Sequence, residues 1–170
     1  MKSTKFLLPL ILISTTAAAT IKGSASFLAK ASNEFLEIEG SELALDTSKA
    51  KVTAGVISGI FSAKVSDMKT GIEMRDGHLR KYLEAEKFPL IELALDPVTV
   101  GGGTKKTFSG KLTIHGVTKP VTGIVEFDSN NATARFTIPD ITQYGVKGVP
   151  TYKNFTIGKS IDVVAKINIL

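Results

Sequence analysis

The 170-residue chain contains no cysteine. This absence excludes disulfides, thiolate catalysis, cysteine-ligated zinc, iron–sulfur clusters and a lipid anchor on an N-terminal cysteine. The chain also lacks the motifs G-x-S-x-G, H-E-x-x-H and G-x-x-x-x-G-K-[ST], which mark common hydrolase, zinc-protease and phosphate-binding sites. Its two histidines, His78 and His115, are too few for a typical zinc site of three or four ligands. We therefore expect no enzyme, metal site or cofactor.

No apolar run reaches the roughly 20 residues that cross a bilayer. The N-terminus instead has the three parts of a secretory signal peptide. Lys2 and Lys5 form the basic start, an apolar run follows over Phe6–Ile13, and the small residues Ala17–Ala19 come next. We predict that residues 1–19 are cleaved after Ala19 and that residues 20–170 form a single soluble domain in the periplasm. The alternative is a buried N-terminal strand.

Positive charge exceeds negative charge only slightly, with a formal net charge of +5 that falls to +3 when Lys2 and Lys5 leave with the signal peptide. The surplus is spread along the chain and indicates no nucleic-acid partner. Lys105 and Lys106 form a basic pair in a loop-like setting, which we interpret as a solvated turn.

Alternation of apolar and polar residues dominates the chain and predicts strands with one buried face. The predicted strands cover about residues 21–30, 35–45, 61–66, 91–96, 111–115, 121–127, 135–138 and 161–169. Turn-forming residues at Gly101–Thr104, His115–Gly116 and Asp128–Asn131 separate several of them. Such short connections favour antiparallel pairing.

One segment departs from this pattern, because Leu79, Tyr82 and Leu83 recur at helical spacing. Asp76 is a suitable N-cap residue for a helix that begins after it. Pro89 prevents the helix from continuing further. We predict one short helix over Gly77–Ala85.

About eight antiparallel strands can close into a barrel without free edges. The interior of a barrel of this size is either filled by side chains or holds one small ligand. The predicted inward residues include small ones, which leave room: Ala25, Ala29, Ala63, Gly123 and Ala165. The fold class is therefore all-β, an eight-stranded antiparallel barrel with one short helix between mid-chain strands.

Two sets of motifs resemble those of the YceI-like family. Met74–Arg80 and Glu86–Pro89 resemble its R-D-x-H-L and E-K-[YF]-P signatures, and Gly110–Val121 resembles G-x-L-T-I-H-G-V-T-K-P-V. The resemblance implies an extended, lipocalin-like barrel, often dimeric, whose apolar tunnel binds polyisoprenoids or other long-chain amphipathic lipids. The segment 33–56 departs from the family pattern, so the resemblance does not fix the chain length of the ligand.

Apolar inward residues are candidates for the tunnel wall, although the sequence does not separate a wall from a packed core. These candidates are Phe61, Val65, Leu93, Leu112, Ile114, Val125, Phe136 and Val163. Candidates for contact with a lipid head group are Arg75, His78, Arg80 and His115, since arginine forks and helix N-termini suit phosphate. The alternative for these four is local: Asp76 caps the helix and pairs with an arginine, and the histidines bond to the backbone.

The predicted function is that of an exported protein that encloses a polyisoprenoid, a fatty acid or another long-chain lipid, for transport or sequestration. Peripheral contact with the membrane and a homodimer are further expectations. One alternative is a filled barrel that acts as an interaction module for a membrane or redox partner. The other is an enzyme that modifies a lipid through His78 or His115.

Overall fold

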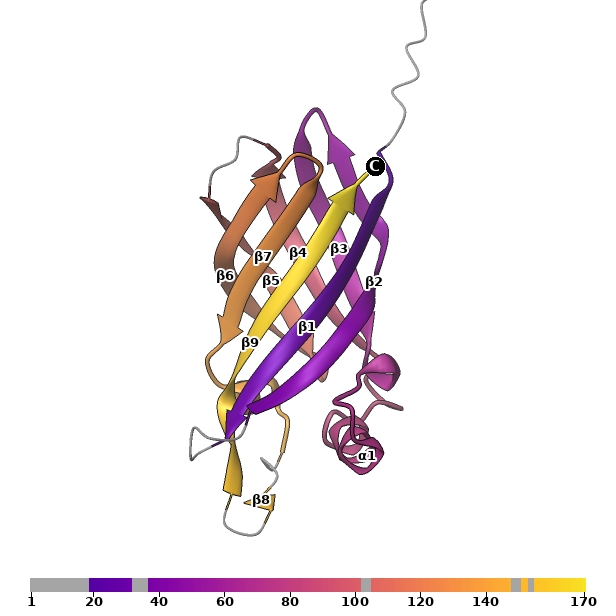
Figure 1. Ribbon diagram of the computed structural model, residues 1–170, viewed down its shortest axis with the longest axis vertical. Helices are drawn as coiled ribbons and strands as arrows, with labels where there is room; N and C mark the ends of the chain where they lie inside the picture. The colour runs from indigo at the N-terminus through magenta and orange to yellow at the C-terminus, as the bar shows by residue number, and fades with distance from the viewer. Residues whose placement is uncertain (1–18, 32–36, 102–104, 148–150, 153–154) are drawn as a thin grey trace, which may run out of the picture.

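Each long strand in the computed structural model pairs antiparallel with the next long strand along the chain (Figure 1). The structure describes residues 19–31, 37–101, 105–147, 151–152 and 155–170, so the predicted signal peptide lies outside it apart from Ala19. The strands are β1 (Ile21–Ala31), β2 (Glu37–Thr53), β3 (Val56–Lys64), β4 (Leu90–Thr99), β5 (Lys105–Ile114), β6 (Val117–Asp128), β7 (Asn131–Ile138), β8 (Thr151–Tyr152) and β9 (Phe155–Ile169).

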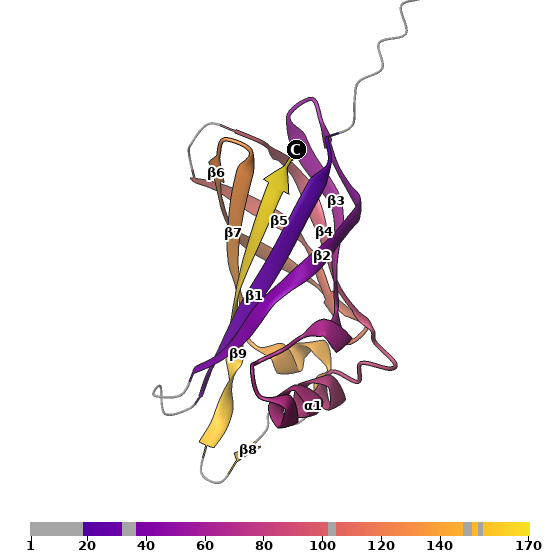
Figure 2. The ribbon, with the colours of Figure 1, turned by 45° about the vertical axis from the view of Figure 1, so that its right-hand side comes forward.

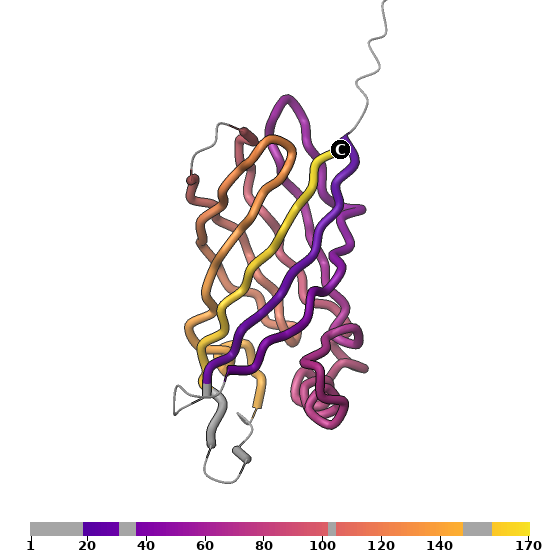
Figure 3. The backbone as a smooth tube through the Cα atoms, in the orientation of Figure 1, coloured from indigo at the N-terminus to yellow at the C-terminus, as the bar shows by residue number. Residues whose placement is uncertain are grey.

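The first and last long strands close the sheet into a barrel (Figure 3). β1 pairs with β9 from Ile21 opposite Ile169 to Ala31 opposite Ile157. Beyond the strand ends, Thr20 and Leu170 exchange two backbone hydrogen bonds of 3.0 and 2.8 Å. The short β8 pairs only with β9 and takes no part in closure. The predicted eight-stranded antiparallel barrel is thus confirmed.

Two β-turns have the backbone that a tight hairpin requires. His115 and Gly116, between β5 and β6, have φ of 52° and 73°, and Ala54 and Gly55 have φ of 48° and 74°. Positive φ at both central residues matches the twist of the flanking strands. The turn predicted at His115–Gly116 is therefore confirmed, and so is the one between Asp128 and Asn131. Residues 102–104 of the third predicted turn lie outside the described residues.

Several strand boundaries were predicted wrongly: β3, β5, β6, β7 and β9 each begin four to six residues earlier than the alternation indicated. β2 continues past Leu45 to Thr53, because a bulge between Asp46 and Lys49 shifts the register and breaks the alternation. Lys105 and Lys106 are not in a solvated turn: they begin β5 and pair with Glu126 and Val125 of β6.

The helix α1 (Glu73–Tyr82) begins four residues earlier than predicted. Asp76 is not its N-cap, a position that Ile72 occupies without a side-chain hydrogen bond. Asp76 lies instead in the first turn, where its Oδ1 accepts hydrogen bonds from the backbone N–H of Thr70, at 2.7 Å, and from the Thr70 hydroxyl. The helix stops before Ala85 because Glu84 has a φ of 44°, which an α-helix does not allow.

The two ends of the barrel differ. At one, which we name the helix end, α1 and two 3₁₀ turns, η1 (Val65–Asp67) and η2 (Ile141–Tyr144), lie across the base of the barrel (Figure 2). Their apolar residues join strand residues in a buried cluster, the helix-end cluster. It consists of Leu43, Ala63, Val65, Met68, Leu83, Leu112, Ile114, Val121, Ile138 and Tyr144. Burial raises the pKa of the Tyr144 hydroxyl. At the other end, the hairpin end, lie both termini of the barrel and the β2–β3 and β6–β7 turns (Figure 1).

The Thr70–Asp76 contact predicts a pH-dependent contribution to stability. Hydrogen bonds from Thr70 hold the pKa of the buried Asp76 carboxyl below its usual range. A lowered folded-state pKa stabilises the fold above the unfolded pKa of about 4, and this contribution disappears as pH falls through the folded value. The Tm of Asp76→Asn should therefore be lower than that of the wild type at neutral pH, and the difference should shrink below about pH 4.

Thermal unfolding over a pH series measures this. Glu73→Gln removes an exposed carboxylate from the same turn and controls for the loss of one negative charge. A Tm difference that stays constant down to the lowest pH would contradict the stabilising role of the Asp76 carboxylate.

Candidate functional site

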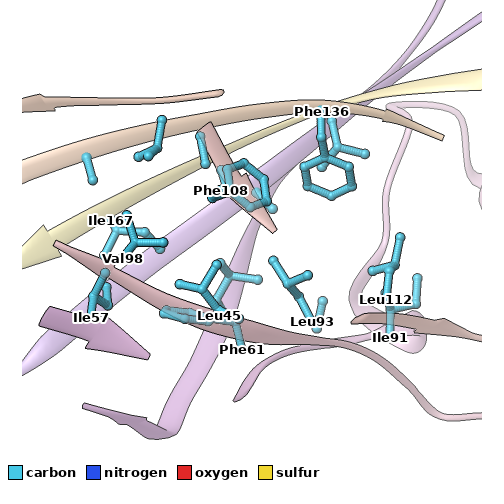
Figure 4. Close-up of a pocket in the computed structure, with 18 of the residues that line it drawn as sticks. Leu45, Ile57, Phe61, Ile91, Leu93, Val98, Phe108, Leu112, Phe136 and Ile167 are labelled. Carbon is cyan, nitrogen blue, oxygen red and sulfur yellow. The ribbon is translucent and has the colours of Figure 1, made fainter. Parts of the chain in front are cut away.

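The inner face of the barrel encloses a cavity of about 120 Å³, lined by apolar side chains alone (Figure 4). Its 19 lining residues come from all eight long strands. Ile57, Val98 and Ile167 line the part nearest the hairpin end, and Ile91 and Leu112 line the part nearest the helix end. A cavity without polar partners does not hold ordered water, so its lining suits apolar groups rather than polar ones.

A row of three alanines leaves this space open. Ala165 of β9 lies opposite Ala25 of β1 on one side and opposite Ala134 of β7 on the other. All three line the cavity. Because directly opposed residues on neighbouring strands lie about 5 Å apart, three short side chains in one row leave a continuous gap along the wall.

Larger side chains form the facing wall. Phe108 of β5 belongs to this wall and meets Phe136 edge to face, with ring centroids 6.0 Å apart and an interplanar angle of 86°. Phe136 itself lies on β7, two residues along from Ala134 of the alanine row. Phe61 and Leu93, which are directly paired on β3 and β4, line the same cavity. The cavity therefore lies between an aromatic and leucine-rich wall and the alanine row.

Gly123 does not add to the cavity as the sequence suggested. A Cβ at this position would lie 2.6 Å from the Phe108 ring and 2.5 Å from the backbone oxygen of Arg135. The missing side chain thus makes room for the Phe108 ring. Ala29, another small residue predicted to leave room, is buried but does not line the cavity, whereas Ala25, Ala63 and Ala165 do.

Six of the eight predicted wall residues line the cavity: Phe61, Leu93, Leu112, Val125, Phe136 and Val163. The other two do not, because they lie further towards the helix end. Val65 follows the end of β3 in the 3₁₀ turn η1, and Ile114 is the last residue of β5. Each is 2% exposed within the helix-end cluster.

The predicted head-group residues divide into two groups. His78 and His115 border one polar pocket outside the helix end, which is also lined by Lys81, Tyr82, Glu84, Lys87 and Lys147. Nε2 of His115 lies 2.5 Å from Oε2 of Glu84, and its ring centroid lies 4.3 Å from that of Phe88. No residue lines both this pocket and the apolar cavity among those described.

The two arginines do not border that pocket. Arg75 donates from Nε to the Thr70 hydroxyl oxygen at 2.8 Å and from Nη2 to the Thr70 carbonyl. Arg80 contributes, with Arg75, to the positive field that lowers the pKa of Asp76. The local alternative is not met as predicted either, because Asp76 is not the N-cap and neither arginine forms an ion pair with it among the described residues. Arg75 bonds instead to Thr70, the residue that holds the Asp76 carboxylate.

Lys106 is a residue near the cavity that sequence reasoning missed. It shares the inner face of β5 with Phe108 and Leu112, which line the cavity. Its Nζ lies 5.5 Å from the ring centroid of Phe127, another lining residue, and donates to the carbonyl oxygen of Thr99 at 2.8 Å. The alternation itself, which runs through positions 106, 108, 110 and 112, was the signal that could have identified it.

Two further findings concern the described part of the chain only. It contains no group of three or more His, Asp or Glu side chains that could hold a metal ion. None of its helices has the length and apolar character needed to span a membrane.

Comparisons with known proteins point to one family. The model of the YceI-like domain matches residues 14–169. The fold is similar to that of BcnA from Burkholderia cenocepacia, with a TM-score of 0.66 and 16% identity over 85% of this chain and 94% of that one. It is also similar to a polyisoprenoid-binding domain from Saccharophagus degradans implicated in plant cell wall breakdown, with a TM-score of 0.64 and 17% identity over 90% of this chain and 98% of that one. The curated proteins contain no match.

The contact between Gly123 and Phe108 predicts a costly small substitution. Gly123→Ala should destabilise the barrel by about 1–3 kcal/mol, because the added methyl group overlaps a backbone oxygen and the aromatic ring. Gly77→Ala is the matched control: its Cβ meets nothing within 4 Å in α1, so it should stabilise the fold by about 0.5–1 kcal/mol. Urea unfolding measures both, and a neutral Gly123→Ala would show that the Phe108 ring is loosely held.

Proposed function

This chain belongs to the YceI-like family, and from that premise we propose that it is an exported periplasmic protein that encloses a polyisoprenoid or another long-chain amphipathic lipid. The observation that carries the proposal is the apolar cavity between the alanine row and the aromatic wall. The signal-peptide pattern of residues 1–19 supports export. The similarity of the fold to a polyisoprenoid-binding domain supports the class of ligand. The role is binding, for transport or sequestration, without chemistry on the lipid.

Burial of the lipid's hydrocarbon chain supplies the binding free energy. Each methylene group removed from water contributes about 0.8 kcal/mol, so ten carbons contribute on the order of 8 kcal/mol before the costs of ordering and association. The lining has no polar side chain that would have to give up a hydrogen bond to water when the lipid enters. A long chain therefore binds more tightly than a short one until the cavity is full.

The depth of the cavity sets a length for the enclosed part of the chain. From Lys106 to Leu112 the strand β5 advances six residues, about 20 Å along the strand and about 15 Å along the axis of a barrel with strands tilted near 40°. An extended alkyl chain advances about 1.25 Å per carbon, so about 12 carbons, or three isoprene units, fit this depth. Beyond Leu112 the helix-end cluster fills the barrel.

Side chains must move to admit such a chain. The cavity of about 120 Å³ is close to the size of an engineered cavity that holds one benzene ring. Phe108 and Phe136, whose rings meet in the lining, are among its largest groups and would turn to enlarge it. We place the ligand along the alanine row, with Phe61, Leu93, Val125 and Val163 around it.

The filled-barrel alternative requires a packed interior, and the cavity favours lipid binding over it. Catalysis through His78 or His115 is disfavoured because their polar pocket shares no lining residue with the cavity in the described structure. The homodimer and the peripheral membrane contact stay predictions.

Native mass spectrometry of the full chain, expressed with its N-terminal segment and purified without detergent, tests the proposed function. We expect a processed protein that starts near Thr20 and carries one lipid, which organic extraction releases and identifies. A bare protein that stays bare after incubation with polyprenols and fatty acids would contradict the proposal. A lipid-loaded protein that keeps residues 1–19 would contradict export alone.

Filling the alanine row with a larger side chain should weaken lipid binding at least tenfold without unfolding the barrel. Ala165→Leu places three more carbons in the cavity between Ala25 and Ala134, and we expect at least a tenfold loss of bound lipid with an unchanged or higher Tm. Ala44→Leu adds the same bulk at an exposed position of β2 and should change neither quantity. Full lipid loading in Ala165→Leu would show that the ligand lies elsewhere.

A further inference from the structure

Lys106 lies where the inner face of β5 reaches the hairpin end. The next residues on the same face, Phe108 and Leu112, line the cavity. Its neighbour Lys105 lies on the outer face and pairs with Glu126 at 3.1 Å. The two adjacent lysines therefore occupy opposite sides of the same strand, and only one is on the cavity side.

The ammonium of Lys106 is held beside the apolar lining. It lies over the ring of Phe127, 5.5 Å from the centroid, and donates one hydrogen bond to the Thr99 carbonyl at 2.8 Å. An ammonium has three N–H donors, so this arrangement leaves two for another acceptor. Within the described residues Lys106 makes no ion pair. The nearby Glu126 is engaged on the outer face by Lys105 and Arg135.

A half-buried cation at the rim of an apolar cavity selects among amphiphiles that have the same chain. An anionic head group forms a charge-assisted hydrogen bond with the ammonium, whereas a neutral hydroxyl forms a weaker one. A cationic head group is repelled. The chain supplies most of the affinity, and the head group decides which lipid and which orientation are preferred.

From this geometry, and resting on the proposed lipid-binding function, we propose that the ligand is a single-chain anionic amphiphile whose carboxylate or phosphate is bound by Lys106 at the hairpin end. The tail then points towards the helix end. The polar pocket of His78 and His115 is not the head-group site, because the helix-end cluster, including Val65 and Leu83, lies between that pocket and the cavity.

The test compares three ligands of one chain length on the delipidated full-chain product: dodecanoate, dodecyl phosphate and 1-dodecanol. Calorimetry below their critical micelle concentrations should show both anions binding about tenfold more tightly than the alcohol, and higher salt should reduce this preference because the rim is partly exposed. The relative affinities of the two anions identify carboxylate or phosphate as the better head group.

Lys106→Met should lose about tenfold in affinity for the anions while its affinity for 1-dodecanol stays within about twofold. Lys106→Arg should keep the preference for anions. The matched control Lys105→Met removes the same charge from the outer face and should leave all three affinities unchanged. Thermal unfolding of each variant confirms that the barrel is intact.

Different failures have different meanings. If the wild type binds the three ligands equally, or if Lys106→Met keeps the preference for anions, the assignment of Lys106 is wrong and lipid binding stands. A preference that is lost in His78→Gln or His115→Gln, and kept in Lys106→Met, would place the head group at the helix end. If no ligand binds to the wild type at any salt concentration, the proposed function itself fails.

Discussion

The antiparallel pairing of β1 with β9 is the constraint on which the rest of the structure depends. It joins the two ends of the barrel and leaves no free strand edge among the eight long strands. Its register also places Ala25 opposite Ala165, beside Ala134. Because a shift of one residue would turn this row to the outer face, the same register closes the barrel and forms the cavity.

Closure of the sheet leaves two barrel ends, and different segments of the chain lie at each. At the helix end, the backbone N–H of Val65 donates to the Pro89 carbonyl and that of Ser41 donates to the Lys69 carbonyl. These bonds anchor the segment that carries α1, while the Thr70–Asp76 contact fixes its first turn. Apolar residues from α1, η1 and η2 then seal this end. The hairpin end has turns and both termini, so under the proposed function it is the end through which a lipid would enter.

Alternation along the sequence predicted the eight-stranded barrel and six of the eight wall residues, because the period of a strand determines which face a side chain shares. The alternation did not determine depth along the barrel axis. Val65 and Ile114 were therefore predicted to line the cavity, although they lie in the helix-end cluster. Asp76 was predicted as the N-cap, whereas its partner, Thr70, lies before the helix. Capping preferences describe only the helix end itself and do not identify such a partner. Lys106 was missed because the glycines before it suggested a loop, although its alternation with Phe108 was visible.

Burial of a hydrocarbon chain has no direction, so an apolar cavity alone would accept a chain in either orientation. Two features outside the cavity lining remove this symmetry. The helix-end cluster blocks passage beyond Leu112, which limits how far a tail can enter. Under the proposed Lys106 assignment, the ammonium beside Phe127 binds an anionic head group at the opposite end. Under the proposed function, the length of the bound tail and its direction therefore depend on different residues, and either property can change by substitution without loss of the other.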